Sequence, residues 1–170
     1  MLLHLTFISH NCPNEATNYN FYLLTADQEI EIKTNHNGCQ TDKYGIDCPL
    51  VNISEMENPE EFNKIKQVVF LVSTYGDGDP TSDCSDFNNL LKDEDFWDKI
   101  TNKELKYTVF GCGSKFYPEF NAQAKLFDKC FSKHGFAKIC PICFGDDAED
   151  IRADFKKWTS EVFWPNFIKS

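Results

Sequence analysis

The fold is decided by the stretch STYGDGDPT at residues 73–81. It directly follows VVFLV at 68–72, which is apolar at every position and too short for a buried helix, so it indicates a strand covered on both faces. Gly76 and Gly78 permit positive φ and let a flat ligand approach the backbone. Tyr75 then has two explanations: it folds back onto the protein in a plain strand-to-helix turn, or a ligand lies on it.

Composition limits the class of protein. The chain has 170 residues, 41% hydrophobic and 15% aromatic, so we expect one domain over 1–170 that buries a full core without disulfides. The formal net charge of -10 argues against nucleic acid and anionic membranes as partners. Residues 1–8 lack a basic region and a long apolar segment, so we expect no secretory signal and no membrane span. The eight cysteines are then expected to be reduced thiols in the cytoplasm.

Along the chain, apolar runs typical of strands alternate with helical spacing. The expected strands are Leu2–Ile8, Pro49–Ile53, Val68–Val72, Lys106–Phe110 and Lys138–Phe144. For the second strand, Glu29–Lys33 is an alternative to Pro49–Ile53. The first expected helix begins at Asn14 and has Ala16, Tyr19, Leu23 and Ala26 on one side. The second spans Glu57–Lys66, with Asn58 as its cap, and the third includes Phe87–Leu91. The last two run from Glu119 to Gly135 and from Asp150 to Phe163.

This alternation implies an open, mostly parallel sheet with helices on both faces. Ligands of such sheets bind beyond the carboxyl ends of the strands. Four loops follow expected strands and should gather at that edge: 9–14, 73–81, 111–121 and 145–149. Tyr75 and Tyr117 come from two of these loops. They could sandwich a planar aromatic ligand, each stacking contributing about 1 kcal/mol beyond area burial.

Three motifs in this order resemble the FMN-binding domain of diflavin reductases: STYGDGDPT at 73–81, VFGCGSKFYPEFN at 109–121 and FGDD at 144–147. That family includes NADPH-cytochrome reductases, sulfite reductase flavoproteins and nitric oxide synthase reductase regions. The resemblance implies a flavodoxin-like, three-layer, doubly wound α/β fold whose five parallel strands lie in the order 2-1-3-4-5. It also implies FMN as the cofactor.

The resemblance places the isoalloxazine ring between Tyr75 and Tyr117. It implies backbone contacts to the ring edge from Thr74 and Gly76, and an acidic residue near the flavin at Asp147. Cofactor contacts are thereby assigned to Ser73, Thr74, Tyr75, Gly76, Cys112, Gly113, Ser114, Tyr117, Phe120, Asn121 and Asp147.

The phosphate loop matches the family least. Relatives show a Ser-x-Thr-Gly-Thr pattern, whereas this chain has SHNCP at 9–13. Pro13 removes one amide donor and both threonine hydroxyls are missing. His10 could add charge, or could be an ordinary exposed loop histidine. The contacts expected to remain are Ser9, His10, Asn11, Cys12 and Asn14.

The remaining cysteines and histidines indicate no further chemistry. Cys140 and Cys143 have CxxC spacing, but within an expected strand they would point to opposite faces, so we interpret them as two core thiols. The four histidines are scattered, and no metal site is expected.

The resemblance predicts a protein that transfers electrons. FMN would receive them from an NADPH/FAD reductase module outside these residues and pass them singly to a haem or iron-sulfur protein, with no catalytic side chain required. This makes the chain the FMN half of an oxidoreductase and not a complete catalyst. An acidic rim would steer a basic acceptor: Asp77, Asp79, Asp83, Asp86, Asp146, Asp147, Glu149 and Asp150. The alternative is a docking or structural module that has lost FMN because of the altered phosphate loop.

Overall fold

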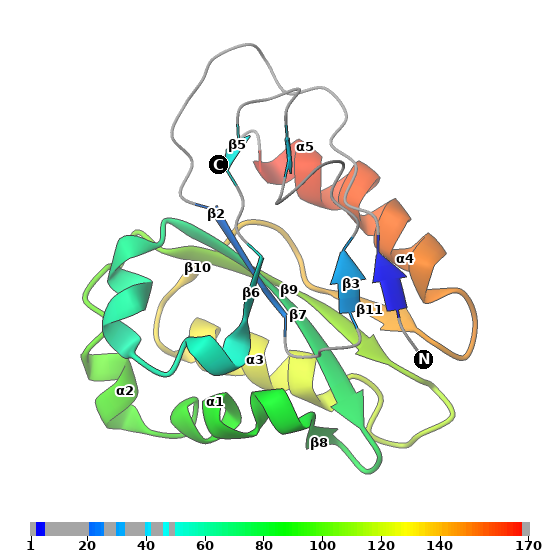
Figure 1. Ribbon diagram of the computed structural model, residues 1–170, viewed down its shortest axis with the longest axis horizontal. Helices are drawn as coiled ribbons and strands as arrows, with labels where there is room; N and C mark the ends of the chain where they lie inside the picture. The colour runs from blue at the N-terminus through cyan, green and yellow to red at the C-terminus, as the bar shows by residue number, and fades with distance from the viewer. Residues whose placement is uncertain are drawn as a thin grey trace.

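The computed structural model describes residues 51–167 in full and, before them, only the backbone of residues 3–5, 21–25, 30–32, 40–41, 46–47 and 50. The main sheet is mostly parallel, with helices on both faces, which confirms the expected α/β class (Figure 1). Across it the strands lie in the order β6 (Leu50–Asn52), β2 (Phe21–Thr25), β7 (Gln67–Tyr75) and β9 (Lys106–Gly113), with β10 (Ala137–Lys138) and β11 (Cys143–Asp146) both beside β9.

Strand β7 is apolar at every core position because both of its faces are covered. Val68, Phe70 and Val72 belong to one buried cluster, and Val69 and Leu71 belong to another. This alternation follows from the two-residue period of a strand. The first cluster lies under α1 (Ser85–Leu90), α2 (Glu94–Asp98) and α3 (Ala122–Lys133); the second lies under α4 (Ile151–Trp158), the π-helix η4 (Thr159–Phe163) and α5 (Trp164–Phe167).

Leu3–Leu5 forms a strand as predicted, but outside the main sheet, and the helix predicted from Asn14 is contradicted at Phe21–Thr25, which is a strand. Strand β1 (Leu3–Leu5) pairs with β3 (Ile30–Ile32) in a separate two-stranded sheet and not with β7. The place beside β7 belongs to β2, which contains Leu23 from the expected helix. The run FYLLT is rich in β-formers, and pairing with β7 on one side and β6 on the other outweighs the helical spacing of its apolar residues.

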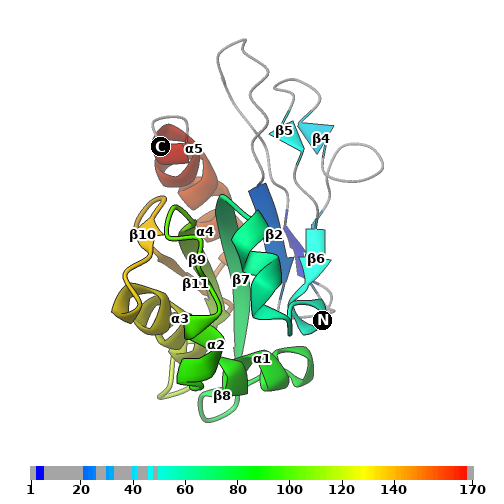
Figure 2. The same cartoon turned by 90° about the vertical axis from the view of Figure 1, so that its left-hand side faces the viewer.

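The choice of Pro49–Ile53 as the second core strand is confirmed by β6, while the alternative segment forms β3 in the small sheet. Within the expected loop 35–45, Gln40–Thr41 forms β4, which pairs antiparallel with β5 (Ile46–Asp47). Figure 2 shows β4 and β5 at the end of the molecule opposite to β8 (Asp79–Pro80).

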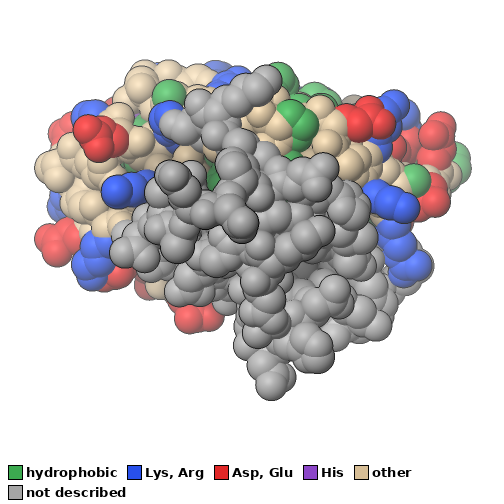
Figure 3. Space-filling model, turned by 90° about the horizontal axis from the view of Figure 1, so that it is seen from above, with side chains coloured by type: hydrophobic (Ala, Val, Ile, Leu, Met, Phe, Trp, Pro, Cys, Tyr) green, Lys and Arg blue, Asp and Glu red, His purple; other side chains and the backbone are tan. Residues whose placement is uncertain are grey.

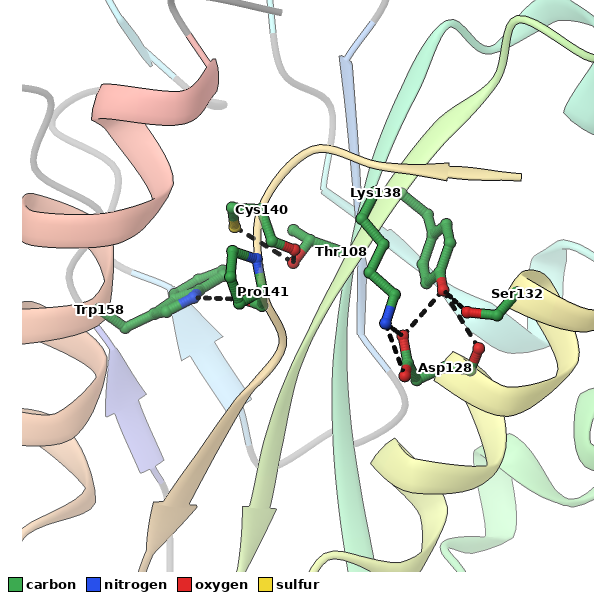
Figure 4. A network of polar contacts seen from close by, with 8 residues as sticks. Thr108, Asp128, Ser132, Lys138, Cys140, Pro141 and Trp158 are labelled. Carbon is green, nitrogen blue, oxygen red and sulfur yellow. Dashed lines mark hydrogen bonds and ion pairs between the residues drawn. The ribbon is translucent and has the colours of Figure 1, made fainter. Parts of the chain in front are cut away.

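The last predicted strand, Lys138–Phe144, is interrupted. It forms β10 and β11, which pair with the beginning and the end of β9, and Pro141 lies in the gap between them. Proline has no N–H to donate to a strand ladder. Side chains replace ladder bonds there: Thr108 Oγ1 donates to the Cys140 carbonyl at 3.2 Å, and Trp158 Nε1 donates to the Pro141 carbonyl at 3.4 Å (Figure 4).

Helix ends agree with the sequence in three places. The Asn58 side chain accepts from Glu60 N as predicted, although the helix is a short 3₁₀ segment, η2 (Pro59–Lys64). Helix α3 ends before Gly135, whose φ of +83° is left-handed. Asp150 caps α4 by accepting from Arg152 N and Ala153 N.

There are two further short 3₁₀ segments in the described part of the chain: η1 (Ile53–Glu55) directly follows β6, and η3 (Ser82–Cys84) lies between β8 and α1. Ser82 and Asp83 lie inside η3, and Asp83 accepts from Asn52 Nδ2 at 2.9 Å. Among the described residues, no helix is both long and apolar enough to cross a membrane.

Candidate functional site

Three neighbouring strands end level with one another. Ser73 of β7 pairs with Cys112 of β9, and Cys112 in turn pairs with Gly145 of β11. Because these strands are parallel, the chain leaves all three at the same edge of the sheet, near β8 in Figures 1 and 2. The loops after β7, β9 and β11 therefore meet as expected at the carboxyl edge, where ligands of open α/β sheets bind.

The first loop is a tight hairpin and not an irregular segment. Strand β7 continues to Tyr75, and β8 pairs back on it, with Pro80 opposite Thr74. Proline is tolerated at this position because β8 is a short edge strand. Gly76 and Gly78 have φ of +44° and +104°, a region that side chains disfavour. The turn leaves Tyr75 69% exposed.

The second loop begins three residues later than predicted, because β9 extends through Gly113. Cys112 points its side chain into the core under α4, so only its backbone is available at the edge. In the loop, Tyr117 N donates to the Ser114 carbonyl at 3.1 Å. Phe116 is 83% exposed and Tyr117 is 54% exposed, so this loop presents two rings to solvent.

Asn121 ends that loop in a left-handed conformation with φ of 55°. It is fully buried, and its Nδ2 donates to the Gly145 carbonyl at 3.1 Å. A Cβ at Gly111 would lie 2.4 Å from Asn121 Oδ1, which explains why that position in β9 is glycine. Asn121 therefore joins the second loop to the end of β11.

Gln123, which the sequence did not single out, joins the first loop to α3. Its backbone N–H donates to Thr74 Oγ1 at 3.2 Å, and its Nε2 donates to the Gly78 carbonyl at 2.6 Å. Thr74 thus caps the N-terminus of α3, because the N-cap residue of that helix, Asn121, makes no side-chain capping bond. No local pattern could reveal these contacts, since the partners lie 49 and 45 residues apart.

In the third loop, Asp146 is a structural residue and not part of the expected acidic rim. Its side chain is buried and accepts from the backbone N–H groups of Lys115 and Ala148, both at 3.0 Å. The Lys115 ammonium lies 3.1 Å from the same carboxylate. These amides and this ammonium hold the pKa of Asp146 below its ordinary value. Asp147 is exposed, and its N–H donates to the Gly113 carbonyl at 2.8 Å.

Phe120 is half-buried and packs edge-on against Phe144, with ring centroids 6.3 Å apart. Lys115 Nζ lies 5.7 Å from the Phe120 ring, and Lys125 Nζ lies 5.6 Å from the Phe144 ring. These contacts fix the base of the second loop.

The predicted phosphate contacts Ser9, His10, Asn11, Cys12 and Asn14 lie outside the described residues. The strand before them, β1, is not in the main sheet. That part of the site stays a prediction.

The CxxC pair is built differently from the expectation, because Cys140 lies in the gap before β11 and not in a strand. Cys140 Sγ lies 3.3 Å from Thr108 Oγ1 (Figure 4). Burial raises the pKa of both thiols, that of Cys143 to about 11. Protonated thiols are poor nucleophiles, which agrees with a packing role.

The ring end of the site fits a planar aromatic cofactor. Tyr75 and Tyr117 are 69% and 54% exposed at the same sheet edge, although tyrosines in folded proteins are usually more buried. A Cβ built on Gly76, next to Tyr75, would meet nothing within 4 Å, so there is open space at the backbone. For a phosphate group, the described residues offer no corresponding loop.

Comparison with known proteins shows the family of the chain. The family model for flavodoxin matches residues 39–158. The chain is 40% identical over 116 residues to the NADPH–cytochrome P450 reductase of Homo sapiens, covering 68% of this chain and 16% of that protein. It is 32% identical over 127 residues to the one of Dictyostelium discoideum, covering 75% of this chain and 19% of that protein. The chain thus spans less than a fifth of these relatives.

Solved structures support the fold alone. A short-chain flavodoxin associated with a bacterial microcompartment superposes with a TM-score of 0.61 at 20% identity, covering 90% of this chain and 98% of that one. Oxidised flavodoxin 1 from Bacillus cereus gives 0.57 at 16% identity, covering 88% and 97%.

Proposed function

The chain belongs to the flavodoxin family, whose cofactor is FMN, and from that premise we propose that it carries electrons between an NADPH/FAD reductase module and a haem or iron-sulfur protein. The observation that carries the proposal is the pair of exposed tyrosines, Tyr75 and Tyr117, on loops that the sheet register brings to one edge. The likeness to NADPH–cytochrome P450 reductases supports the choice of this electron path over that of a free-standing flavodoxin.

We assign the ring of FMN to the space between these tyrosines. Stacking on both faces would bury ring surface that is otherwise exposed and would contribute about 1 kcal/mol for each face beyond area burial. Gly76 lies beside Tyr75 without a side chain, so its peptide can face the ring edge and change orientation at little steric cost. We also assign contacts with FMN to the backbone of Cys112 and Gly113 at the end of β9 and of Ser114 after it, with Asp147 beside Gly113, whose carbonyl accepts the Asp147 N–H.

Once bound, FMN supplies the redox chemistry, accepting and donating electrons. The protein's residues bind the ring, keep one edge of it near the surface and hold a negative field around it. Exposed carboxylates at this edge are Asp77, Asp79, Asp147 and Glu149. Such a rim would attract a basic acceptor and raise the rate of encounter. On the face seen in Figure 3, by contrast, acidic and basic side chains are interspersed around the undescribed residues.

The experiment is a stopped-flow measurement of electron transfer from the photoreduced, FMN-loaded chain to cytochrome c, a basic haem protein. The observed rate should fall steeply with added salt, because the Debye length shrinks from roughly 10 Å at 0.1 M to about 3 Å at 1 M. The double variant Asp147→Asn and Glu149→Gln should lower the rate at low salt and flatten its salt dependence. Lys156→Gln and Lys157→Gln on α4 serve as a control for changes in charge elsewhere on the surface.

Two results would count against the proposal. A protein that binds no FMN would favour a docking module without cofactor. A protein that binds FMN but reduces cytochrome c at a rate indifferent to salt and to both carboxylates would leave the rim as ordinary solvated surface.

A further inference from the structure

The second loop is fixed at both ends to two consecutive residues of β11. At its start, Lys115 donates its N–H to Asp146 Oδ1 at 3.0 Å and places its ammonium 3.1 Å from Asp146 Oδ2. At its end, Asn121 Nδ2 donates to the Gly145 carbonyl at 3.1 Å. Between these ties the chain has little burial, since Phe116 and Tyr117 are 83% and 54% exposed. The position of Tyr117 is therefore set mainly at the two ends of its loop.

The anchor on β11 is itself rigid. Asp146 also accepts from Ala148 N, and its own N–H donates to Asp154 Oδ2 at 3.0 Å. A Cβ at Gly145 would lie 2.6 Å from Ile151 Cγ1 and 2.7 Å from Phe110 Cζ, so the strand end is tightly enclosed. Interiors packed at this density do not deform continuously.

The two side chains that hold the second loop, Asp146 and Asn121, make their hydrogen bonds in a buried environment. Asp146 is 2% exposed and Asn121 is 0% exposed, so their hydrogen bonds are shielded from water. The Asp146 bonds involve a charged acceptor, and such bonds are about twice as strong as neutral ones. The charged groups that act on Lys115 are Asp146, Glu149 and Asp154, so loss of Asp146 leaves the ammonium with weaker, more distant partners.

We propose that Asp146 and Asn121 are positioning residues, which hold the second loop at both ends and thereby set how closely Tyr117 stacks on the flavin ring. The inference rests on the proposed function, because it requires the ring to lie against Tyr117. Asn121 was expected to contact FMN directly, and Asp146 was expected in the acidic rim. In this proposal both residues act on FMN indirectly, by fixing the loop that carries Tyr117.

The test uses the full chain loaded with FMN and three variants: Asp146→Asn, Asn121→Gly and Lys115→Met. Glycine keeps the left-handed backbone that residue 121 requires, and Lys115 has an exposed ammonium end, so these two variants should fold. Three quantities are measured: the fluorescence of bound FMN, its dissociation constant, and the unfolding temperature of the protein without FMN. Glu104→Gln is the control, since it removes one negative charge from an exposed side chain just before β9, at the opposite end of that strand from the second loop.

We expect each of the three variants to leave bound FMN more fluorescent than in the wild type, because Tyr117 quenches less when it stacks loosely. The dissociation constant should rise roughly tenfold for Asp146→Asn, the order expected when one charge-assisted hydrogen bond is lost. Lys115→Met combined with Asp146→Asn should add little to either single change, because both act on one contact. Glu104→Gln should match the wild type.

A purely structural role would lower the unfolding temperature but leave the quenching of bound FMN at its wild-type level in all three variants, and that result would overturn the inference. It is distinct from failure of the proposed function, in which the wild type itself would show neither FMN binding nor quenching.

Discussion

Strand β9 has a tyrosine near each end, and the two are treated in opposite ways. Tyr107, at its start, is fully buried, and its hydroxyl lies 2.8 Å from Asp128 Oδ1 and 2.7 Å from Ser132 Oγ (Figure 4). Tyr117, after its end, is 54% exposed, and within the part of the chain that the structure describes its backbone N–H alone is hydrogen-bonded, to the Ser114 carbonyl. At the amino end of the strand the tyrosine is buried and hydrogen-bonded within the protein, whereas at the carboxyl end the tyrosine is left exposed. We propose that this difference in burial separates rings that build the fold from rings that bind FMN.

The largest expected effect comes from removing a ring that builds the fold. Phe131 is fully buried and lies 4.9 Å from Phe70 and 5.0 Å from Tyr107, measured between ring centroids. Phe131→Ala should lower the free energy of unfolding by about 3 to 5 kcal/mol through lost burial and a cavity. Phe116→Ala, at the exposed end, should change it by less than about 0.5 kcal/mol. Urea unfolding of both variants measures the contrast, and equal losses would contradict the distinction between the two classes of ring.

A smaller loss is expected from crowding the junction between the core and the site. In Gly111→Ala the new Cβ would lie 2.4 Å from Asn121 Oδ1 and 2.6 Å from Ala124 Cβ. Overpacking of this kind costs about 1 to 3 kcal/mol. Because the displaced group is Asn121, FMN binding should weaken as well. Thermal unfolding with and without FMN separates the two effects, and an unchanged protein would mean that Asn121 can move freely.

Removing the polar part of the buried tyrosine should cost less. Tyr107→Phe keeps the ring and deletes a hydroxyl that makes a network with Asp128 and Ser132, a loss of about 1 kcal/mol. Burial holds the pKa of Tyr107 above its ordinary value of 10.0, so the wild type should lose Tyr107's contribution to stability as the pH rises past that value. The stability difference from Tyr107→Phe should therefore narrow at high pH. A constant difference from neutral to alkaline pH would show that the hydroxyl titrates equally in both states.

The mirror-image dependence is expected of Asp146 at the site. Its folded pKa lies below the ordinary value of 3.8, chiefly because of the amide of Lys115, so its contribution is fully present above that value and is lost as pH falls through the folded pKa. Asp146→Asn should be less stable than the wild type near neutral pH, and the two should converge in acid. Urea midpoints at a series of pH values test this, and a difference that persists in strong acid would assign the effect to packing and not to charge.

What the sequence predicted well was local. The apolar run 68–72 and the glycines after it predicted a buried strand and a tight turn, because a short stretch contains all the necessary chemistry. The cap at Asn58 and the helix stop at Gly135 are local in the same sense.

What it missed depends on partners far along the chain. Phe21–Thr25 has apolar spacing that suits a helix, and only its pairing with β7 and β6 makes it a strand. Asp146 and Asp147 are consecutive aspartates, yet Asp146 is buried and accepts a hydrogen bond from the Lys115 N–H, whereas Asp147 is exposed. Gln123 showed no signal at all, because its role is set by Thr74 and Gly78.

The most direct test of the account is a fluorescence titration of FMN with the protein and with the double variant Tyr75→Leu and Tyr117→Leu. Both side chains are exposed, so the variant should fold as the wild type does. We predict that the wild type quenches FMN on binding, and that the variant binds at least roughly tenfold more weakly, given about 1 kcal/mol for each lost stacking contact, and leaves bound FMN fluorescent. Equal affinity and equal quenching in the two proteins would show that the ring does not lie between Tyr75 and Tyr117.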